Sequence, residues 1–222
     1  MNDNYSNEFK IILLGDSKVG KTSFFRKLTT GEFNVDETIT LSINRKTIQT
    51  KMEHDKEVII SIFDTPGIYR LRSTAERLYD IIDGIILIYD NYSFENLQEW
   101  IDVLKEVILD DIPILLLKNE KQLETNKDII SKEEKFAEEK GFKFDGCSIK
   151  NDSQENLLSI FNKFAKYVFE NSPVKKREKE RKKKILEEER MKKAKKEEII
   201  KKVSEENKAE KNLYVLLKYF SF

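Results

Sequence analysis

Eight consecutive residues near the N-terminus have the types and the spacing that bind phosphate. They run Gly15-Asp16-Ser17-Lys18-Val19-Gly20-Lys21-Thr22 and match the pattern G-x-x-x-x-G-K-[ST]. The glycines let main-chain N–H groups close around phosphate oxygens, and a following helix N-terminus adds its positive dipole end. In such a loop Lys21 reaches the β- and γ-phosphates and the Thr22 hydroxyl ligates Mg²⁺. The sequence therefore predicts a site for a phosphorylated ligand and Mg²⁺.

A second motif supplies a carboxylate for the same metal. Asp64-Thr65-Pro66-Gly67 follows an apolar run, at the point where a phosphate-loop protein needs an acidic group near Mg²⁺. Gly67 has no side chain, so its N–H can approach a γ-phosphate closely. We expect Asp64 and Gly67 to lie beside the phosphate loop.

The elements that must position these motifs are apolar runs alternating with helical patterns. Trp100 lies at core spacing on one of the helices, and Ser131 followed by Glu134 forms a capping box that starts another. The predicted strands cover 9–14, 41–52, 58–63, 84–89, 112–117 and 142–147, and the predicted helices cover 21–30, 71–82, 94–110, 131–141 and 154–171. This alternation predicts an α/β fold with a six-stranded, mostly parallel sheet and five helices.

Charge divides the 222 residues into two parts. Residues 1–173 carry 23 Lys and Arg against 31 Asp and Glu, and residues 174–222 carry 18 against 10. The sequence thus predicts an acidic domain over 1–173 and a basic tail over 174–222. Repeated Glu-to-Lys pairs four residues apart favour a single charged helix in the tail, where apolar positions are too sparse for a sustained coiled coil. The last ten residues, LYVLLKYFSF, are apolar.

Composition excludes several other kinds of site. A single cysteine, Cys147, and a single histidine, His54, exclude a disulfide framework and metal sites built from nitrogen or sulfur ligands. The N-terminus lacks a signal-peptide pattern, and no stretch of 18 apolar residues predicts a membrane span. We expect a cytoplasmic protein.

The motifs together resemble those of a Ras-superfamily small GTPase, closest to the Rab type. The phosphate loop, FDTPG, GIILIYDNYSFENLQEW and CSIKN carry this resemblance, which covers about residues 8–171. It implies a P-loop NTPase small G domain that binds GTP or GDP with Mg²⁺ and switches through two loops that order around the γ-phosphate. It also implies protein effectors and regulators at those loops, and a role in vesicle trafficking.

The resemblance assigns roles to further residues. Phe33 would pack on the base, and the CSIKN segment would flank it. The nucleotide-binding set expected on this basis is Gly15, Asp16, Ser17, Lys18, Val19, Gly20, Lys21, Thr22, Ser23, Phe33, Thr40, Asp64, Gly67, Asn119, Glu120, Gln122, Ser148, Ile149 and Lys150. The metal ligands would be Thr22, Asp64 and a switch I threonine. Spacing favours Thr40 for that threonine and the local Thr-Ile pattern favours Thr38; we prefer Thr40.

Three positions depart from the family. Ile68 stands where the family usually has a glutamine that orients water, so we assign no catalytic residue and expect very slow hydrolysis. The family's guanine-reading N-K-x-D is here Asn119-Glu120-Lys121-Gln122. Guanine offers two N–H donors on one edge, and an aspartate accepts both. The neutral amide of Gln122 has one acceptor oxygen and satisfies only half of that edge, which weakens binding by about 2–4 kcal/mol. Weak base selectivity follows.

The sequence leaves two functional interpretations. The first is a divergent Rab-like nucleotide switch with little hydrolysis, and the second is a pseudo-GTPase scaffold that binds partners through its fold and charged tail. No cysteine follows Cys147, so we expect no prenyl anchor. The basic run 175–184 offers peripheral contact with an anionic membrane, but we favour a solvated helix whose apolar end docks on the domain or on a partner. Nucleic-acid binding is disfavoured because the run lacks interleaved aromatic residues.

Overall fold

The computed structural model describes residues 8–35, 38–51, 57–67, 73–107, 112–120, 127–172, 180 and 183–197. The chain divides into two units, Met1–Lys175 and Lys176–Phe222, and each is described by itself. Among the described residues, the first unit contains six strands, five α-helices and one 3-10 turn. In chain order they are β1 (Glu8–Leu14), α1 (Lys21–Thr30), β2 (Asn44–Lys51), β3 (Glu57–Asp64), α2 (Ser73–Tyr79), β4 (Gly84–Tyr89), η3 (Phe94–Asn96), α3 (Leu97–Val107), β5 (Ile114–Asn119), α4 (Lys127–Glu139), β6 (Lys143–Cys147) and α5 (Gln154–Asn171).

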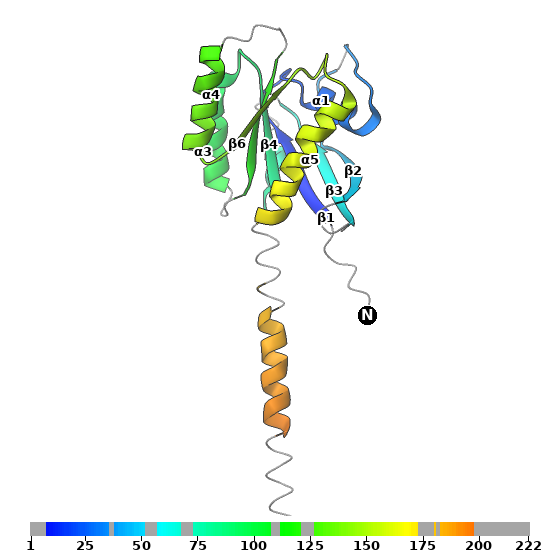
Figure 1. The fold of residues 1–222 in the computed structure, drawn as a ribbon, viewed down its shortest axis with the longest axis vertical. Helices are drawn as coiled ribbons and strands as arrows, with labels where there is room; N and C mark the ends of the chain where they lie inside the picture. The colour runs from blue at the N-terminus through cyan, green and yellow to red at the C-terminus, as the bar shows by residue number, and fades with distance from the viewer. Residues whose placement is uncertain are drawn as a thin grey trace, which may run out of the picture. The chain divides into compact units, whose positions relative to one another are not determined.

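The six strands form one sheet in the order β2-β3-β1-β4-β5-β6 (Figure 1). β2 pairs antiparallel with β3, and every other neighbouring pair is parallel. The carboxyl ends of β1, β3, β4, β5 and β6 therefore share one edge, where ligands bind in open α/β sheets. The predicted six-stranded, mostly parallel sheet with five helices is confirmed.

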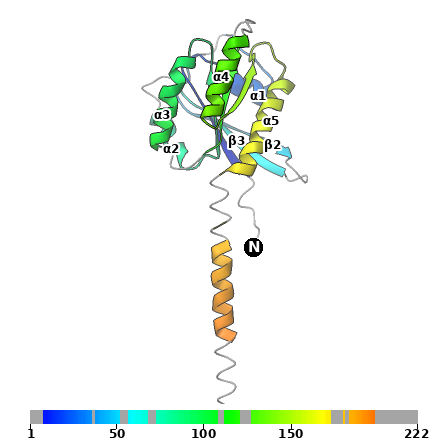
Figure 2. The ribbon, with the colours of Figure 1, turned by 60° about the vertical axis from the view of Figure 1, so that its left-hand side comes forward.

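Helices cover both faces of the sheet (Figures 1 and 2). Alternate residues of β1 divide between two cores, with Ile11 and Leu13 on the side of α1 and α5, and Ile12 and Leu14 on the side of α2, α3 and α4. This continuous apolar strand is what a parallel strand buried on both faces requires. This doubly paired strand ends at Leu14, directly before the loop that begins at Gly15.

Several element boundaries differ from the prediction for identifiable reasons. β2 begins at Asn44 and not at residue 41, because Asn44 pairs with Asp64, the last residue of β3. β5 begins at Ile114 and not at residue 112, because Pro113 has no N–H to give to a ladder. α2 ends at Tyr79, three residues early, because the chain must turn there to enter β4.

The capping box predicted at Ser131 is wrong. α4 begins at Lys127, so Ser131 lies inside the helix. Glu133, which is 2% exposed, forms an ion pair with Lys118 of β5 at 2.8 Å. We attribute the placement of α4 to this buried contact.

The second unit is described over 180 and 183–197, and residues 183–197 form a helix. Every side chain of that helix is exposed, including its apolar ones, Ile185, Leu186 and Met191. The predicted apolar terminus and most of the basic run 175–184 lie outside the described residues. In the part of the chain that is described, no helix is both long and apolar enough to cross a membrane.

Candidate nucleotide site

The phosphate loop joins β1 to α1 through backbone conformations that most residues avoid. Gly15 has φ 134° and Gly20 has φ 109°, and a Cβ on Gly15 would overlap the carbonyl oxygen of Ile88 in β4. Lys18 also has a positive φ, 66°, which is unusual for a residue with a side chain. Such strained backbone is typical of functional loops, and here it shapes the turn between strand and helix.

Lys21 is drawn into this loop. Its side chain is buried, and its Nζ donates hydrogen bonds to the carbonyl oxygens of Gly15 at 2.8 Å and Asp16 at 2.6 Å. Gly67, just after β3, packs so closely that a Cβ there would lie 2.5 Å from the Lys21 Nζ. A single cation is therefore held between the phosphate loop and the end of β3.

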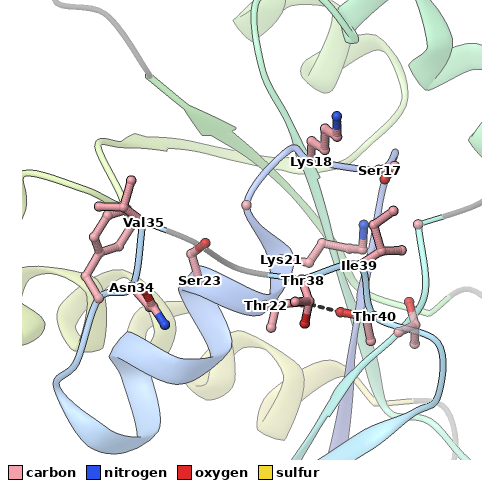
Figure 3. Close-up of a pocket in the computed structure, with 14 residues that line it drawn as sticks. Ser17, Lys18, Lys21, Thr22, Ser23, Asn34, Val35, Thr38, Ile39 and Thr40 are labelled. Atoms are coloured by element: carbon pink, nitrogen blue, oxygen red, sulfur yellow. Dashed lines mark hydrogen bonds between the residues drawn. The ribbon is translucent and has the colours of Figure 1, made fainter.

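Three side-chain oxygens meet next to Lys21. The Oγ1 atoms of Thr22 and Thr40 are 2.7 Å apart (Figure 3). Thr22 Oγ1 also donates a hydrogen bond of 2.9 Å to Oδ2 of the fully buried Asp64. Since Thr22 gives its proton to Asp64, Thr40 must be the donor to Thr22. Hydroxyl and carboxylate oxygens are the ligands that Mg²⁺ prefers, so this donor set fits that ion.

A cavity of about 310 Å³ opens above these residues (Figure 3). Thr38 lines it as well as Thr40, but Thr38 is exposed whereas Thr40 is half-buried. The lining residues are Ser17, Lys18, Gly20, Lys21, Thr22, Ser23, Phe33, Asn34, Val35, Thr38, Ile39, Thr40, Thr65 and Gly67. Among the described residues of the predicted base loops, 119–120 and 148–150, none lines this cavity.

The base loops lie behind the phosphate loop, and Asn119 joins them. Its Nδ2 donates to the Val19 carbonyl at 2.8 Å, and its Oδ1 accepts from the Ile149 N–H at 3.2 Å. The Glu120 N–H donates to the Cys147 carbonyl at 2.8 Å. The loops are thus connected by hydrogen bonds that do not involve the exchanged side chain of Glu120. Gln122 and Ile68 lie outside the described residues.

Lys27 also holds the base loop, and the sequence analysis missed it. This buried lysine of α1 donates from Nζ to the carbonyls of Ile149 at 3.0 Å and Lys150 at 3.1 Å. The same Nζ lies 5.7 Å from the ring centroid of Phe33. Lysine is rarely buried unless paired, so a lysine between apolar helix positions is a signal that sequence analysis could use.

The remaining base-loop residues are fixed in place. The Ser148 N–H donates to Asp152 Oδ2 at 2.9 Å. Cys147 is buried, and burial raises the pKa of its thiol to about 12. The thiol therefore stays protonated at neutral pH and acts as a small apolar group.

The side chain of Asp16 in the phosphate loop bonds to partners on a distant element. Its carboxylate accepts hydrogen bonds from Asn96 and Trp100 of the segment after β4. Trp100 is 2% exposed, as its core spacing predicted, but its contact with Asp16 was not foreseen.

Comparison with known proteins agrees with this geometry. A sequence model described as the Ras family matches residues 10–170. The Ras-related protein SEC4 of Saccharomyces cerevisiae is 33% identical over 169 residues, which cover 75% of this chain and 77% of SEC4. Ras-related protein Rab-10 of Diplobatis ommata is 32% identical over 180 residues, covering 79% of this chain and 88% of Rab-10. Ras-related protein Rab-13 of Mesocricetus auratus is 33% identical over 166 residues, which cover 73% of this chain and 80% of Rab-13.

Proposed function

The chain belongs to the Ras family and is a Rab-like small GTPase, and from this premise we propose a specific function. It is a nucleotide- and Mg²⁺-dependent switch that hydrolyses GTP slowly or not at all and selects weakly between bases. The observation that carries the proposal is the meeting of the Thr22, Thr40 and Asp64 oxygens beside Lys21. These groups would hold Mg²⁺ and the phosphates, and Mg²⁺ would neutralise phosphate charge there.

Weak base selectivity is supported by a contrast between the residues that hold the base loops and the residues that would recognise the base. Asn119 and Lys27 hold the base loops in place, whereas Glu120 and Gln122 replace the lysine and aspartate of the family motif. Phe33 lines the cavity and would still pack on any base, because stacking is tolerant of base identity.

Slow hydrolysis is supported by Ile68. An alkyl side chain has no donor or acceptor and cannot orient an attacking water. The chain's own residues would then bind and position the nucleotide without activating water, and a partner would have to supply that group. The lifetime of the bound state would be set mainly by release or by the partner.

Partners would bind the loop that carries Thr40. Val35, Ile39 and Leu41 are 77%, 53% and 70% exposed, an unusual run of large apolar side chains at the surface of one short segment. Because Thr40 from the same segment joins the Thr22 and Asp64 cluster, occupancy of the site would change the position of this apolar run. This coupling would let effectors and regulators distinguish nucleotide states.

The scaffold interpretation rests on the exchanged groups themselves. If base selection and hydrolysis are both lost, the domain could serve only to present this apolar segment and the charged helix 183–197 to partners. A Mg²⁺-dependent titration separates the two functions, because a scaffold needs no nucleotide.

The test is a titration of full-length protein with a fluorescent GTP analogue, with Mg²⁺ or with EDTA. We expect micromolar or tighter binding that weakens at least tenfold in EDTA. Thr40→Ala and Thr38→Ala form a matched pair, and only Thr40→Ala should reduce the dependence on Mg²⁺. Binding weaker than millimolar would contradict the nucleotide switch and favour the scaffold function. A larger effect of Thr38→Ala than of Thr40→Ala would assign the Mg²⁺ contact to Thr38.

A further inference from the structure

Asp16 connects the phosphate loop to an element far along the chain. Its Oδ2 accepts a hydrogen bond of 2.6 Å from Asn96 Nδ2, and its Oδ1 accepts one of 2.9 Å from Trp100 Nε1. These partners are 80 and 84 residues away in sequence. Both oxygens of one carboxylate are therefore bound by donors from η3 and α3.

The donors are themselves held firmly. The Trp100 ring is buried in the core that packs α3 against the sheet, together with Leu14 and Leu87. The turn before η3 is closed by Ser93, whose Oγ accepts from the Asp90 N–H and donates to Asp90 Oδ1, each at 2.8 Å. The carboxylate of Asp16 is thus attached to a rigid part of the domain.

The backbone of Asp16 faces the candidate site. Its carbonyl oxygen accepts from Lys21 Nζ at 2.6 Å, and a Cβ on Gly67 would lie 2.7 Å from the same oxygen. One residue therefore contacts α3 with its side chain, and with its main chain it contacts Lys21 and the start of the loop after β3. Asp16 therefore links the two contacts covalently, through its own side chain and main chain.

An acidic side chain in a loop for anions needs a physical reason. A carboxylate and a phosphate are both negatively charged and repel each other. This repulsion falls with distance, and hydrogen bonds to the carboxylate reduce it further. Bonds to Asn96 and Trp100 hold the charge toward α3, and Asp16 does not line the cavity. They also restrain a loop that contains strained residues, and restraint in the binding conformation favours affinity.

We propose that Asp16 is a positioning residue that holds the phosphate loop in its binding conformation through Asn96 and Trp100, and that Trp100 thereby senses occupancy of the loop. This inference rests on the proposed nucleotide binding. Trp100 is the only tryptophan of the chain, so its indole N–H gives a single NMR signal.

The first measurement follows that indole signal in ¹⁵N-labelled full-length protein. Asp16→Ala should shift the signal in the free protein, because a charged acceptor is lost. GDP with Mg²⁺ should shift the wild-type signal and leave that of Asp16→Ala nearly unchanged. Gln98→Ala, which removes only a local hydrogen bond to Asp102 on α3, is the matched control and should behave as wild type.

The second measurement is the dissociation rate of a fluorescent GDP in a double-mutant cycle. We expect rates about tenfold faster for Asp16→Ala and about fivefold faster for Trp100→Phe, which keeps an aromatic side chain in the core but removes the indole N–H together with the second ring. The double variant should be no faster than about tenfold, because both changes remove the same bond. Asn96→Ala is an exposed substitution that cannot empty the core, and it should accelerate release about threefold.

Each contrary result has a distinct meaning. An indole signal that is the same in wild type and Asp16→Ala overturns the inference, and so do single-variant effects that multiply in the double variant. Wild-type binding with unchanged rates in all variants also overturns the inference but leaves the proposed function standing. Failure of the wild type to bind any nucleotide with Mg²⁺ overturns both.

Discussion

The phosphate half and the base half of the candidate site differ in how many of the family's ligand-binding side chains they keep. In the phosphate half, Thr22 bonds to Thr40 and to Asp64, and Lys21 bonds to the Gly15 carbonyl beside the same cavity. In the base half, the supporting hydrogen bonds of Asn119 are present, but the side chains that read guanine in the family are exchanged. The first half has both scaffold and chemistry, and the second has mainly scaffold.

This difference shows that, in the base half, the residues that hold the loops in place are not the residues that recognise the base. The base loops are held by main-chain groups, by Asn119 and by Lys27, none of which depends on residue 120 or 122 being the family's type. In the described part of the base loops, these bonds are therefore compatible with a glutamate at position 120. In the phosphate half the ligand-binding groups are also the packing groups, so an exchange there would disturb both.

The largest effect should come from breaking the phosphate half. Lys21→Ala removes the buried cation between Gly67 and the loop, and nucleotide affinity should fall about 1,000-fold, as for other buried charged contacts. Lys46→Ala, which changes an exposed lysine of β2 outside the cavity, is the control. The measurement is a fluorescent-nucleotide titration. Equal affinities of the two variants would mean that the site lies elsewhere.

Repairing the base half should give the next largest effect. Gln122→Asp restores a carboxylate that can accept both guanine N–H groups, so GTP affinity should rise at least about 30-fold while ATP affinity stays unchanged. Competition titrations with both nucleotides measure this ratio, and Gln122→Glu, with a longer side chain, tests whether position matters as well as charge. No gain for GTP would show that position 122 does not face the base.

Hydrolysis offers a smaller effect that depends on the phosphate half being intact. Ile68→Gln should raise single-turnover GTP hydrolysis about fivefold, since one oriented hydrogen bond contributes about 1 kcal/mol. Ile68→Leu is the matched control, because it changes shape without adding a donor. If the Ile68→Gln and Ile68→Leu variants hydrolyse GTP at the same rate, the position of the loop that carries Thr40 limits hydrolysis instead.

The smallest effect is expected at Cys147 in the base half. Because burial raises the pKa of this thiol to about 12, it should react with Ellman's reagent at pH 8 only upon unfolding in guanidinium. Without guanidinium the thiol should stay unreactive whether or not nucleotide is added, since the loop is already formed. Rapid reaction in the free protein would mean that the base loop opens.

Sequence alone predicted those parts of the molecule that depend on neighbouring residues. The strands β1, β4 and β5 follow from short contiguous apolar runs, and the phosphate loop follows from eight consecutive residues. Errors arose where a distant contact decides the outcome, as at α4, which begins before the Ser131 capping box and buries Glu133 against Lys118.

The same reason explains what was missed in the site. Lys27 bonds to a carbonyl 122 residues away, and Asp16 bonds to Trp100 across 84 residues. No local pattern of residue types reports such pairs, because either partner alone is compatible with many environments. Trp100 at core spacing predicted burial correctly, but the direction of its N–H depends on how α3 is placed on the sheet.

The central claim is that the phosphate half supplies most of the affinity and the base half little selectivity. Its most direct test is the set of dissociation constants for GTP, ATP and XTP, measured with Mg²⁺ on the same full-length protein. We expect all three to bind, with constants within about tenfold of one another. A preference for GTP of 1,000-fold or more, or no binding of any of the three below about 1 mM, would contradict it.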